Sequence, residues 1–481
     1  MKLRLVGHGE RYAVEQLQLA LFPEEPMEQT DAPFTGDGAV SALHRGKCYL
    51  TATAQIRLHG KTVRAARRMK LAQEDVTSRR RLLQNAYYAA AMLLRDPPEW
   101  GSLSGVRPTK LTTRHLLAGG TAESAERLLR ENYHVTPERS RLAAECSLAT
   151  VQAARLLRQT DVSLYLGIPF CPTRCVYCSF VSQTTGRQGT LLEPYLDALV
   201  REIEVTARLL REAGRTVRTL YIGGGTPTTL STPQLRRLMQ AIAANFDLSS
   251  LIEYTVEGGR PDTLDAEKLR TLRELGCGRV SINPQTMQPG VLRRIGRCHS
   301  PEQTREAYLQ AGQAGFEAIN TDLIAGLPTD TPAGFADSLT QVLQLQPANI
   351  TVHTLALKKG ADLYFSREEL PTAEAVREML ADAEARLRAA GYKPYYLYRQ
   401  KYMSGSFENV GWTKPGFECL YNIYMMEELH SILSLGGGGM TKINLPDGRL
   451  ERFHNPKFPQ QYIARLDDVL SQKAAAVALL R

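Results

Sequence analysis

From residue 161 onward, the chain alternates between short β-branched or aromatic runs and longer segments of helical periodicity. This alternation restricts the fold, because each helix must return the chain so that the next strand lies parallel to the last. Six strands are expected, fewer than the eight that close a barrel. We therefore predict an α/β fold built on an open six-stranded (βα)6 partial barrel. The six runs are residues 162–168, 217–223, 251–257, 278–284, 319–326 and 349–357.

The distribution of charge divides the chain near residue 160. Residues 1–160 hold 24 Lys and Arg against 16 Asp and Glu, a net charge of +8, and the rest contributes only +1 of the total of +9. Strand-like runs followed by helical patterns predict a basic N-terminal α+β domain over residues 1–160. The barrel is expected over residues 161–390, and a C-terminal extension over residues 391–481.

Three of the eight cysteines, Cys171, Cys175 and Cys178, lie in the stretch "CPTRCVYC". This cysteine content is ordinary for an intracellular chain, which disfavours disulfides. A structural zinc site normally has four ligands in paired knuckles, so zinc is the weaker alternative. Three thiolates suit a [4Fe–4S] cluster that keeps one iron open. An open iron can bind the amino and carboxylate groups of S-adenosylmethionine (SAM) and pass an electron to its sulfonium, which breaks a C–S bond and gives a 5′-deoxyadenosyl radical.

Polar residues stand at the ends of the other predicted strands. The stretch "GGGTPT" begins at Gly223 after the second strand, and Glu257 ends the third. Gln285 and Arg297 follow the fourth strand, and the fifth carries Asp322. Glycines let a backbone approach a ligand closely, and parallel sheets bind ligands at the carboxyl ends of their strands. We therefore expect these residues and the cysteines to line one cavity.

The stretches "SLYLGIPFC", "YIGGGTPT" and "INTDLIAGLP", with the cysteine motif, resemble the oxygen-independent coproporphyrinogen III oxidase family over about residues 161–445. "GRPDT", "SINPQTM" and "IGRCHS" are similar to its HemZ-type branch. The resemblance implies a partial barrel of the radical SAM type, a [4Fe–4S] cluster with the three cysteines as metal ligands, and one or two SAM molecules. It implies catalytic roles for the cysteines, Tyr165 and Glu257. The implied SAM contacts are Tyr165, Tyr177, Gly223, Gly224, Gly225, Thr226, Glu257, Gln285, Arg297 and Asp322, and the last three would also contact a second SAM.

The activity that the resemblance implies is the oxidative decarboxylation of two propionates of coproporphyrinogen III, which gives protoporphyrinogen IX in anaerobic haem biosynthesis. This chain has Phe180 where the oxidase has a further cysteine, and Gly167 where it has a histidine. A related branch contains haem-binding chaperones that keep the cluster. Their His-Asn-x-x-Tyr-Trp motif corresponds here only to the stretch from Tyr421 to Met426. The alternatives are thus a haem chaperone, or a radical SAM enzyme acting on another tetrapyrrole.

The C-terminal region, residues 391–481, is expected to cover the tetrapyrrole substrate. Residues 392–412 are rich in aromatic and basic side chains, which suit pyrrole faces and propionates. The alternative is a tyrosine-rich strand packed over the barrel. The candidates are Tyr392, Tyr395, Tyr396, Tyr398, Arg399, Lys401, Tyr402 and Trp412.

A basic segment runs from Arg57 to Arg81, with nine basic residues against Glu74 and Asp75. It is either a solvated face or a docking surface for an acidic electron donor such as a flavodoxin or ferredoxin. Nucleic acid is the less expected partner. No apolar run approaches the ~18 residues of a membrane span, so we predict no span and a cytoplasmic location.

Overall fold

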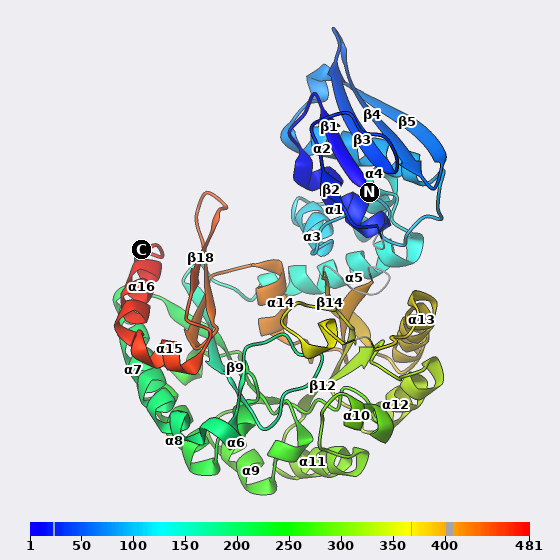
Figure 1. The fold of residues 1–481 in the computed structure, drawn as a ribbon. Helices are drawn as coiled ribbons and strands as arrows, with labels where there is room; N and C mark the ends of the chain where they lie inside the picture. The colour runs from blue at the N-terminus through cyan, green and yellow to red at the C-terminus, as the bar shows by residue number, and fades with distance from the viewer. Residues whose placement is uncertain (23–24, 367, 401–406) are drawn as a thin grey trace. The chain divides into compact units, whose positions relative to one another are not determined.

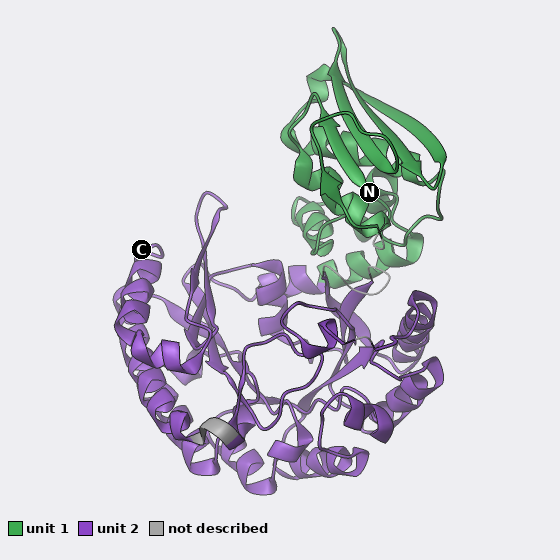
Figure 2. Cartoon of the chain, viewed as in Figure 1, with its two compact units in different colours: residues 1–148 green, residues 149–481 purple. Residues whose placement is uncertain are grey.

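The computed structural model describes residues 1–22, 25–366, 368–400 and 407–481. The chain forms two compact units, residues 1–148 and residues 149–481 (Figure 2). The division falls inside helix α5 (Pro137–Ala154). The division into three domains, with boundaries at residues 160 and 390, stays a prediction. No helix in the described ranges is long and apolar enough to cross a membrane.

The first unit contains a five-stranded sheet in the order β2-β1-β3-β4-β5. Strand β1 pairs in parallel with β2 and β3, whereas β3, β4 and β5 pair antiparallel. Alternate residues of β4, such as Ala52 and Ile56, are buried in a core shared with helices α1 and α2. The elements are β1 (Lys2–Val6), α1 (Arg11–Leu21), β2 (Glu28–Gln29), β3 (Gly38–Arg45), β4 (Tyr49–Leu58), β5 (Lys61–Lys70), α2 (Val76–Ala91), α3 (Thr109–Leu117) and α4 (Ala122–Tyr133).

The second unit is built on a sheet of eleven strands (Figure 1). Its centre is a run of six parallel strands in the order β13-β12-β11-β10-β9-β6, and helices between them cover the outer face. The predicted six-stranded partial barrel is therefore confirmed. The strands are β6 (Asp161–Ile168), β9 (Thr216–Gly224), β10 (Glu253–Glu257), β11 (Arg279–Ser281), β12 (Ala318–Ala325) and β13 (Asn349–Thr354). The helices are α7 (Leu192–Glu212), α8 (Thr232–Asn245), α9 (Ala266–Glu274), α10 (Pro289–Arg294), α11 (Pro301–Gln313), α12 (Pro332–Gln344) and α13 (Ala373–Ala389).

The two faces of the barrel sheet differ in polarity. Leu164, Leu166 and Ile168 of β6 point outward into the hydrophobic core beneath the helices. Because side chains alternate along a strand, Ser163 and Tyr165 point inward. The interior is polar at the amino ends of the strands, where Arg279 of β11 forms a buried ion pair with Glu253 of β10. Because this ion pair fills the amino ends, a ligand site is expected at the carboxyl ends of the strands.

The C-terminal extension adds strands to both edges of the barrel. Strand β16 pairs in parallel with β6, which makes seven parallel strands rather than six. A hairpin follows it on that side, and two antiparallel strands follow β13 on the other. The remaining elements are β14 (Lys393–Arg399), β15 (Glu408–Thr413), α14 (Leu420–Glu427), β16 (Ile432–Gly436), β17 (Met440–Asn444), β18 (Leu450–His454), α15 (Pro459–Ala464) and α16 (Leu466–Ala478).

Candidate active site

The cysteine loop begins at the carboxyl end of β6. The short strand β7 (Phe170–Cys171) pairs with β8 (Gln183–Thr184), and the loop between them carries all three cysteines. Cys175 is buried, and Cys171 and Cys178 are half-buried. Burial raises the pKa of the Cys178 thiol, and so does the proximity of the other two cysteines. In the described part of the chain, no three His, Cys, Asp or Glu side chains are placed to hold one metal ion. A [4Fe–4S] cluster does not require the three thiolates to converge on one metal ion, because each thiolate binds a different iron.

The glycine stretch after β9 packs directly on the cysteine loop. A Cβ on Gly225 would lie 2.8 Å from Cys171 Sγ and 2.6 Å from the carbonyl oxygen of Phe170. Gly224 has a φ of +124°, and a Cβ there would lie 2.7 Å from the backbone nitrogen of Ile168. The Thr226 hydroxyl lies 3.5 Å from Cys171 Sγ. Only glycines fit here, because the glycine stretch packs against the cysteine loop without room for a Cβ.

A carboxyl group and three tyrosines lie next to this stretch. The Tyr221 hydroxyl donates a hydrogen bond of 2.6 Å to Glu257 Oε1, and a Cβ on Gly223 would lie 3.0 Å from Glu257 Oε2. Burial, and to a lesser extent the charge of Asp322, raises the pKa of Glu257 to about 7. Tyr165 and Tyr421 both stack with Tyr221, at centroid distances of 6.1 and 4.5 Å.

Arg297 and Tyr177 are neighbours, and Tyr177 belongs to the cysteine loop. Arg297 is buried and donates to the carbonyl oxygens of Asn283, at 2.5 Å, and Gly259, at 3.3 Å. Burial raises the pKa of the Tyr177 hydroxyl, and the neighbouring Arg297 guanidinium opposes that rise. The structure thus brings these two predicted residues together beside Cys175.

Several buried polar atoms in this region have no hydrogen-bond partner among the described residues. They are Asn283 Oδ1, Gln285 Oε1 and Arg297 Nε. Gln285 also has a φ of +69°, and its backbone bridges β12 through hydrogen bonds with Asp322 and Ile324. Buried polar groups are normally satisfied, so unsatisfied ones at the end of a barrel strand are consistent with a bound ligand.

Asp322 has a neighbour, His353, that the sequence reasoning did not single out. Its Oδ2 lies 3.6 Å from His353 Nε2 on β13, and His353 Nδ1 lies 3.4 Å from the Tyr398 hydroxyl on β14. Both Asp322 and His353 are about one quarter exposed. His353 lay in a predicted strand, but no motif marked it. Tyr221 and Tyr421 were missed likewise, because tyrosines in apolar runs are typical of a core.

The tyrosine-rich segment is mostly packed rather than open. Tyr392, Tyr395, Tyr396 and Trp412 are each at most 5% exposed. Tyr396 lies over Gly411, where a Cβ would come within 1.9 Å of its ring. The packed-strand alternative therefore describes these four residues, and Tyr398 remains beside His353. Lys401 and Tyr402 lie outside the described residues.

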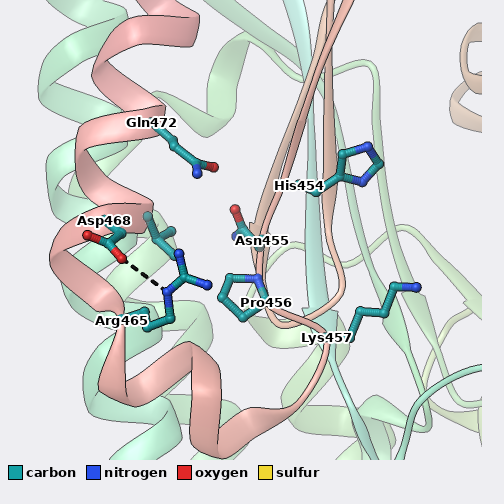
Figure 3. A pocket seen from close by; sticks show the side chains of 8 residues that line it. His454, Asn455, Pro456, Lys457, Arg465, Asp468 and Gln472 are labelled. Carbon is teal, nitrogen blue, oxygen red and sulfur yellow. Dashed lines mark hydrogen bonds and ion pairs between the residues drawn. The ribbon is translucent and has the colours of Figure 1, made fainter.

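Two hollows lie away from the centre of the barrel. A pocket of about 630 Å³ lies behind the cysteine loop and is lined by Thr173, Arg174, Leu292, Arg293, Arg297 and His299, among others. A smaller polar one lies between the end of β18 and α16, where Arg465 pairs with Asp468 at 3.0 Å (Figure 3). The smaller pocket contains none of the predicted site residues.

Comparisons with known proteins show which families the chain is similar to. The sequence profile of the Radical SAM superfamily matches residues 165–342. The chain is 38% identical over 382 residues to the oxygen-independent coproporphyrinogen-III oxidase-like protein HemZ of Bacillus subtilis strain 168, covering 78% of this chain and 76% of that protein. It is 28% identical over 309 residues to the heme chaperone HemW of Escherichia coli K12, covering 64% and 77%. The solved structure of coproporphyrinogen III oxidase (HemN) from Escherichia coli matches with a TM-score of 0.54 and 28% identity, covering 67% of this chain and 73% of that one.

Proposed function

Because the chain belongs to the radical SAM family of oxygen-independent coproporphyrinogen III oxidase-like proteins, in the branch that contains HemZ, we propose that it is a coproporphyrinogen III oxidase. Membership of this family implies a [4Fe–4S] cluster and SAM. The proposed reaction converts coproporphyrinogen III to protoporphyrinogen IX in the cytoplasm, as a step of porphyrin and haem biosynthesis.

In this proposal, the three cysteines hold the cluster as thiolates. The open backbone of Gly223–Gly225 and the Glu257 carboxylate hold the amino group of SAM, because this stretch packs on Cys171 at Gly225 and on Glu257 at Gly223. Thr226, Tyr165 and Tyr177 complete the first SAM site. Gln285, Arg297 and Asp322 contact SAM as well, and the unsatisfied Gln285 Oε1 and Arg297 Nε support a polar ligand there. The same three residues are the proposed contacts of a second SAM.

When bound, the cluster and SAM supply a carbon radical that can remove hydrogen from an unactivated position. Each of two propionates would lose one hydrogen atom from the carbon next to the pyrrole, then CO2 and one electron, which leaves a vinyl group. Asp322 and His353, which lie 3.6 Å apart and are each about one quarter exposed, are the proposed contacts of the pyrrole nitrogens or a propionate. The released electron requires an acceptor.

The site also bears on the chaperone alternative. The stretch of this chain that corresponds to the chaperones' haem motif forms helix α14, where Tyr421 and Tyr424 are buried. Tyr421 is stacked on Tyr221 inside the barrel, and the Met425 sulfur contacts Lys442 Nζ at 3.3 Å. Side chains engaged in this way are poor haem ligands, which favours the oxidase over the chaperone.

An anaerobic assay tests the proposal. Reconstituted protein with SAM, a reductant and coproporphyrinogen III should give protoporphyrinogen IX, with one 5′-deoxyadenosine formed for each propionate lost. Stable haem binding without turnover would instead identify a chaperone. Turnover of a different tetrapyrrole alone would identify the third alternative.

We further propose that an acidic protein, such as a flavodoxin or ferredoxin, delivers the electron that reduces the cluster. The exposed Arg174 on the cysteine loop supports this, because opposite charge accelerates the encounter of two proteins.

A further inference from the structure

The sheet of the first unit has one face that no helix of its core covers. Ala52, Ala54 and Ile56 of β4 point toward α1 and α2, so the alternate residues Thr51, Thr53 and Gln55 point the other way. The antiparallel register extends this second face to β3 and β5. We call it the open sheet face. Its members are Lys2, Arg4 and Val6 on β1, Val40, Ala42 and His44 on β3, Tyr49, Thr51, Thr53, Gln55 and Arg57 on β4, and Thr62, Arg64, Ala66, Arg68 and Lys70 on β5.

The open sheet face carries a dense positive charge. Six of its residues are Lys or Arg: Lys2, Arg4, Arg57, Arg64, Arg68 and Lys70. None of these forms an ion pair with any residue that the structure describes. Glu28 on the edge strand β2 lies opposite Lys2, and the backbone of Asp31 accepts a hydrogen bond from Arg4. The uncompensated charge is therefore concentrated on β4 and β5.

The rest of the basic segment differs from this face. Arg79 and Arg80 of α2 both pair with Glu10, and Arg79 and Arg45 also pair with Glu74. The segment that the sequence presents as one basic stretch is thus divided by the fold. On α2, Arg79 and Arg80 are paired with carboxylates, whereas the cations of the open sheet face on β4 and β5 are not.

The shape and the side chains of the open sheet face favour the binding of an extended polyanion. Its centre consists of small side chains, and an open hollow of about 660 Å³ is lined there by Val40, Thr53, Gln55, Arg64 and Ala66, among others. At one end, the Arg68 guanidinium lies over the Tyr49 ring at 5.0 Å, and Tyr49 is 40% exposed. A cationic groove beside an exposed aromatic ring is typical of surfaces that bind single-stranded nucleic acid.

A protein partner fits this face less well. Protein interfaces are centred on buried aromatic or aliphatic anchors, and only Val6 and Tyr49 are large, apolar and exposed among the described residues of this face. Hydroxyl and amide groups occupy its centre instead, on Thr51, Thr53, Gln55 and Thr62. Such groups can hydrogen-bond the 2′-hydroxyl that distinguishes RNA from DNA.

We propose that the open sheet face binds single-stranded RNA. Arg57, Arg64 and Arg68 contact phosphates, a base stacks on Tyr49, and the threonines contact ribose hydroxyls. The sequence alone did not favour nucleic acid as a partner. Nucleic acid is favoured by the folded chain because strand pairing brings the cations without ion pairs together on one face of the sheet. This activity is independent of the barrel site and of the proposed oxidase function.

The test is fluorescence anisotropy of a labelled mixed-sequence RNA of about 20 nucleotides, titrated with the full-length protein. The variant is Arg64→Gln/Arg68→Gln. Its matched control is Arg127→Gln/Arg130→Gln, which removes the same charge from exposed positions on α4 of the same unit. Thermal unfolding of both variants verifies that they are folded. We expect the variant to lose at least ~10-fold in RNA affinity at low salt, and the slope of log K against log salt to fall by about 1.4, or about 0.7 for each phosphate contact. The control should match the native protein.

Three results would overturn the proposal. The first is the absence of salt-dependent RNA binding by the native protein. The second is equal loss in variant and control, which would reflect net charge alone. The third is binding of polyglutamate or of DNA of the same sequence as tightly as RNA, because the first would indicate an acidic protein partner and the second would remove the role of the ribose hydroxyls. A Tyr49→Ala variant adds an independent readout: loss of base stacking should weaken RNA binding about 5- to 100-fold, and unchanged affinity would contradict the stacking role of Tyr49.

Discussion

Among single residues, Gly225 has the least freedom to change. Its missing Cβ leaves the space occupied by Cys171 Sγ and the Phe170 carbonyl oxygen, and overpacking of this kind typically costs about 1–3 kcal/mol. We expect Gly225→Ala to displace Cys171 and to lower the iron and sulfide content after reconstitution severalfold. Gly278→Ala is the control, because a Cβ there meets nothing within 4 Å. Equal cluster content in the two variants would show that the glycine stretch does not shape the cluster site.

The three cysteines of the loop make the second residue-scale prediction. Replacing Cys171, Cys175 or Cys178 by alanine leaves one iron without its thiolate, so the visible absorbance of the cluster and the cleavage of SAM should both be lost. Cys298→Ala, at an exposed cysteine outside the loop, should retain both. Full cluster loading in Cys175→Ala would refute the assignment.

The raised pKa of Glu257 predicts that the affinity for SAM depends on pH. This pKa of about 7 means that the carboxyl is protonated in mildly acidic solution and then lacks the negative charge that attracts the positively charged amino group of SAM. SAM affinity should fall about 10-fold for each pH unit below 7, and Glu257→Gln should abolish this dependence. Because the folded pKa lies above the ordinary 4.5, the favourable contribution of Glu257 to folding is present below pH 4.5 and is lost as the pH rises through about 7. Equilibrium dialysis of SAM across this range measures the effect, and a pH-independent native protein would contradict it.

Single residues also show how much of the candidate site could be predicted from the sequence. The cysteines, the glycines and Glu257 could be predicted, because a spacing or a strand-end position identifies them. His353 and Tyr421 could not be predicted. His353 becomes notable only because the register of β12 and β13 places it beside Asp322. Tyr421 comes from a helix about 200 residues away in sequence from Tyr221, and only the folded chain stacks the two rings.

Among the elements, strand β16 shows why the edge of the barrel was missed. Its residues Ile432–Gly436 run into a glycine-rich turn and resemble a loop in isolation. What makes them a strand is parallel pairing with β6, which is far away in sequence. A buried network fixes it there. Glu202 of α7 accepts from Gly436 N and from the Tyr462 hydroxyl, and pairs with Lys473 of α16 at 3.3 Å.

This network predicts that breaking the buried Glu202–Lys473 ion pair costs more unfolding free energy than breaking the exposed Arg465–Asp468 ion pair. The side chains of Glu202 and Lys473 are 0% and 2% exposed, so Lys473→Met leaves a buried carboxylate without its cation and should cost about 3–5 kcal/mol of unfolding free energy. Arg465→Met removes an exposed partner of Asp468 in the same C-terminal region and should cost less than ~1 kcal/mol. Urea unfolding monitored by circular dichroism measures both. The double variant Glu202→Gln/Lys473→Met should recover part of the loss, and equal losses in the two single variants would contradict the role of the network.

At the scale of the whole molecule, the excess of positive charge has two candidate uses, and they lie in different units. The open sheet face belongs to residues 1–148, whereas the cluster loop with the exposed Arg174 belongs to residues 149–481. An electron donor must come near the cluster. We therefore expect charges on the cysteine loop itself, such as that of Arg174, to contribute to steering.

Turnover with two reductants separates these uses. With a flavodoxin donor at low salt, Arg174→Gln should slow turnover severalfold, because long-range attraction raises the rate of encounter and is screened beyond about 8 Å at physiological ionic strength. With dithionite, which needs no protein contact, the same variant should be unchanged, provided that its cluster content equals that of the native protein. Arg64→Gln/Arg68→Gln should change neither rate. If this sheet variant lowers turnover with flavodoxin alone, the open sheet face docks the acidic donor, and its assignment to RNA fails.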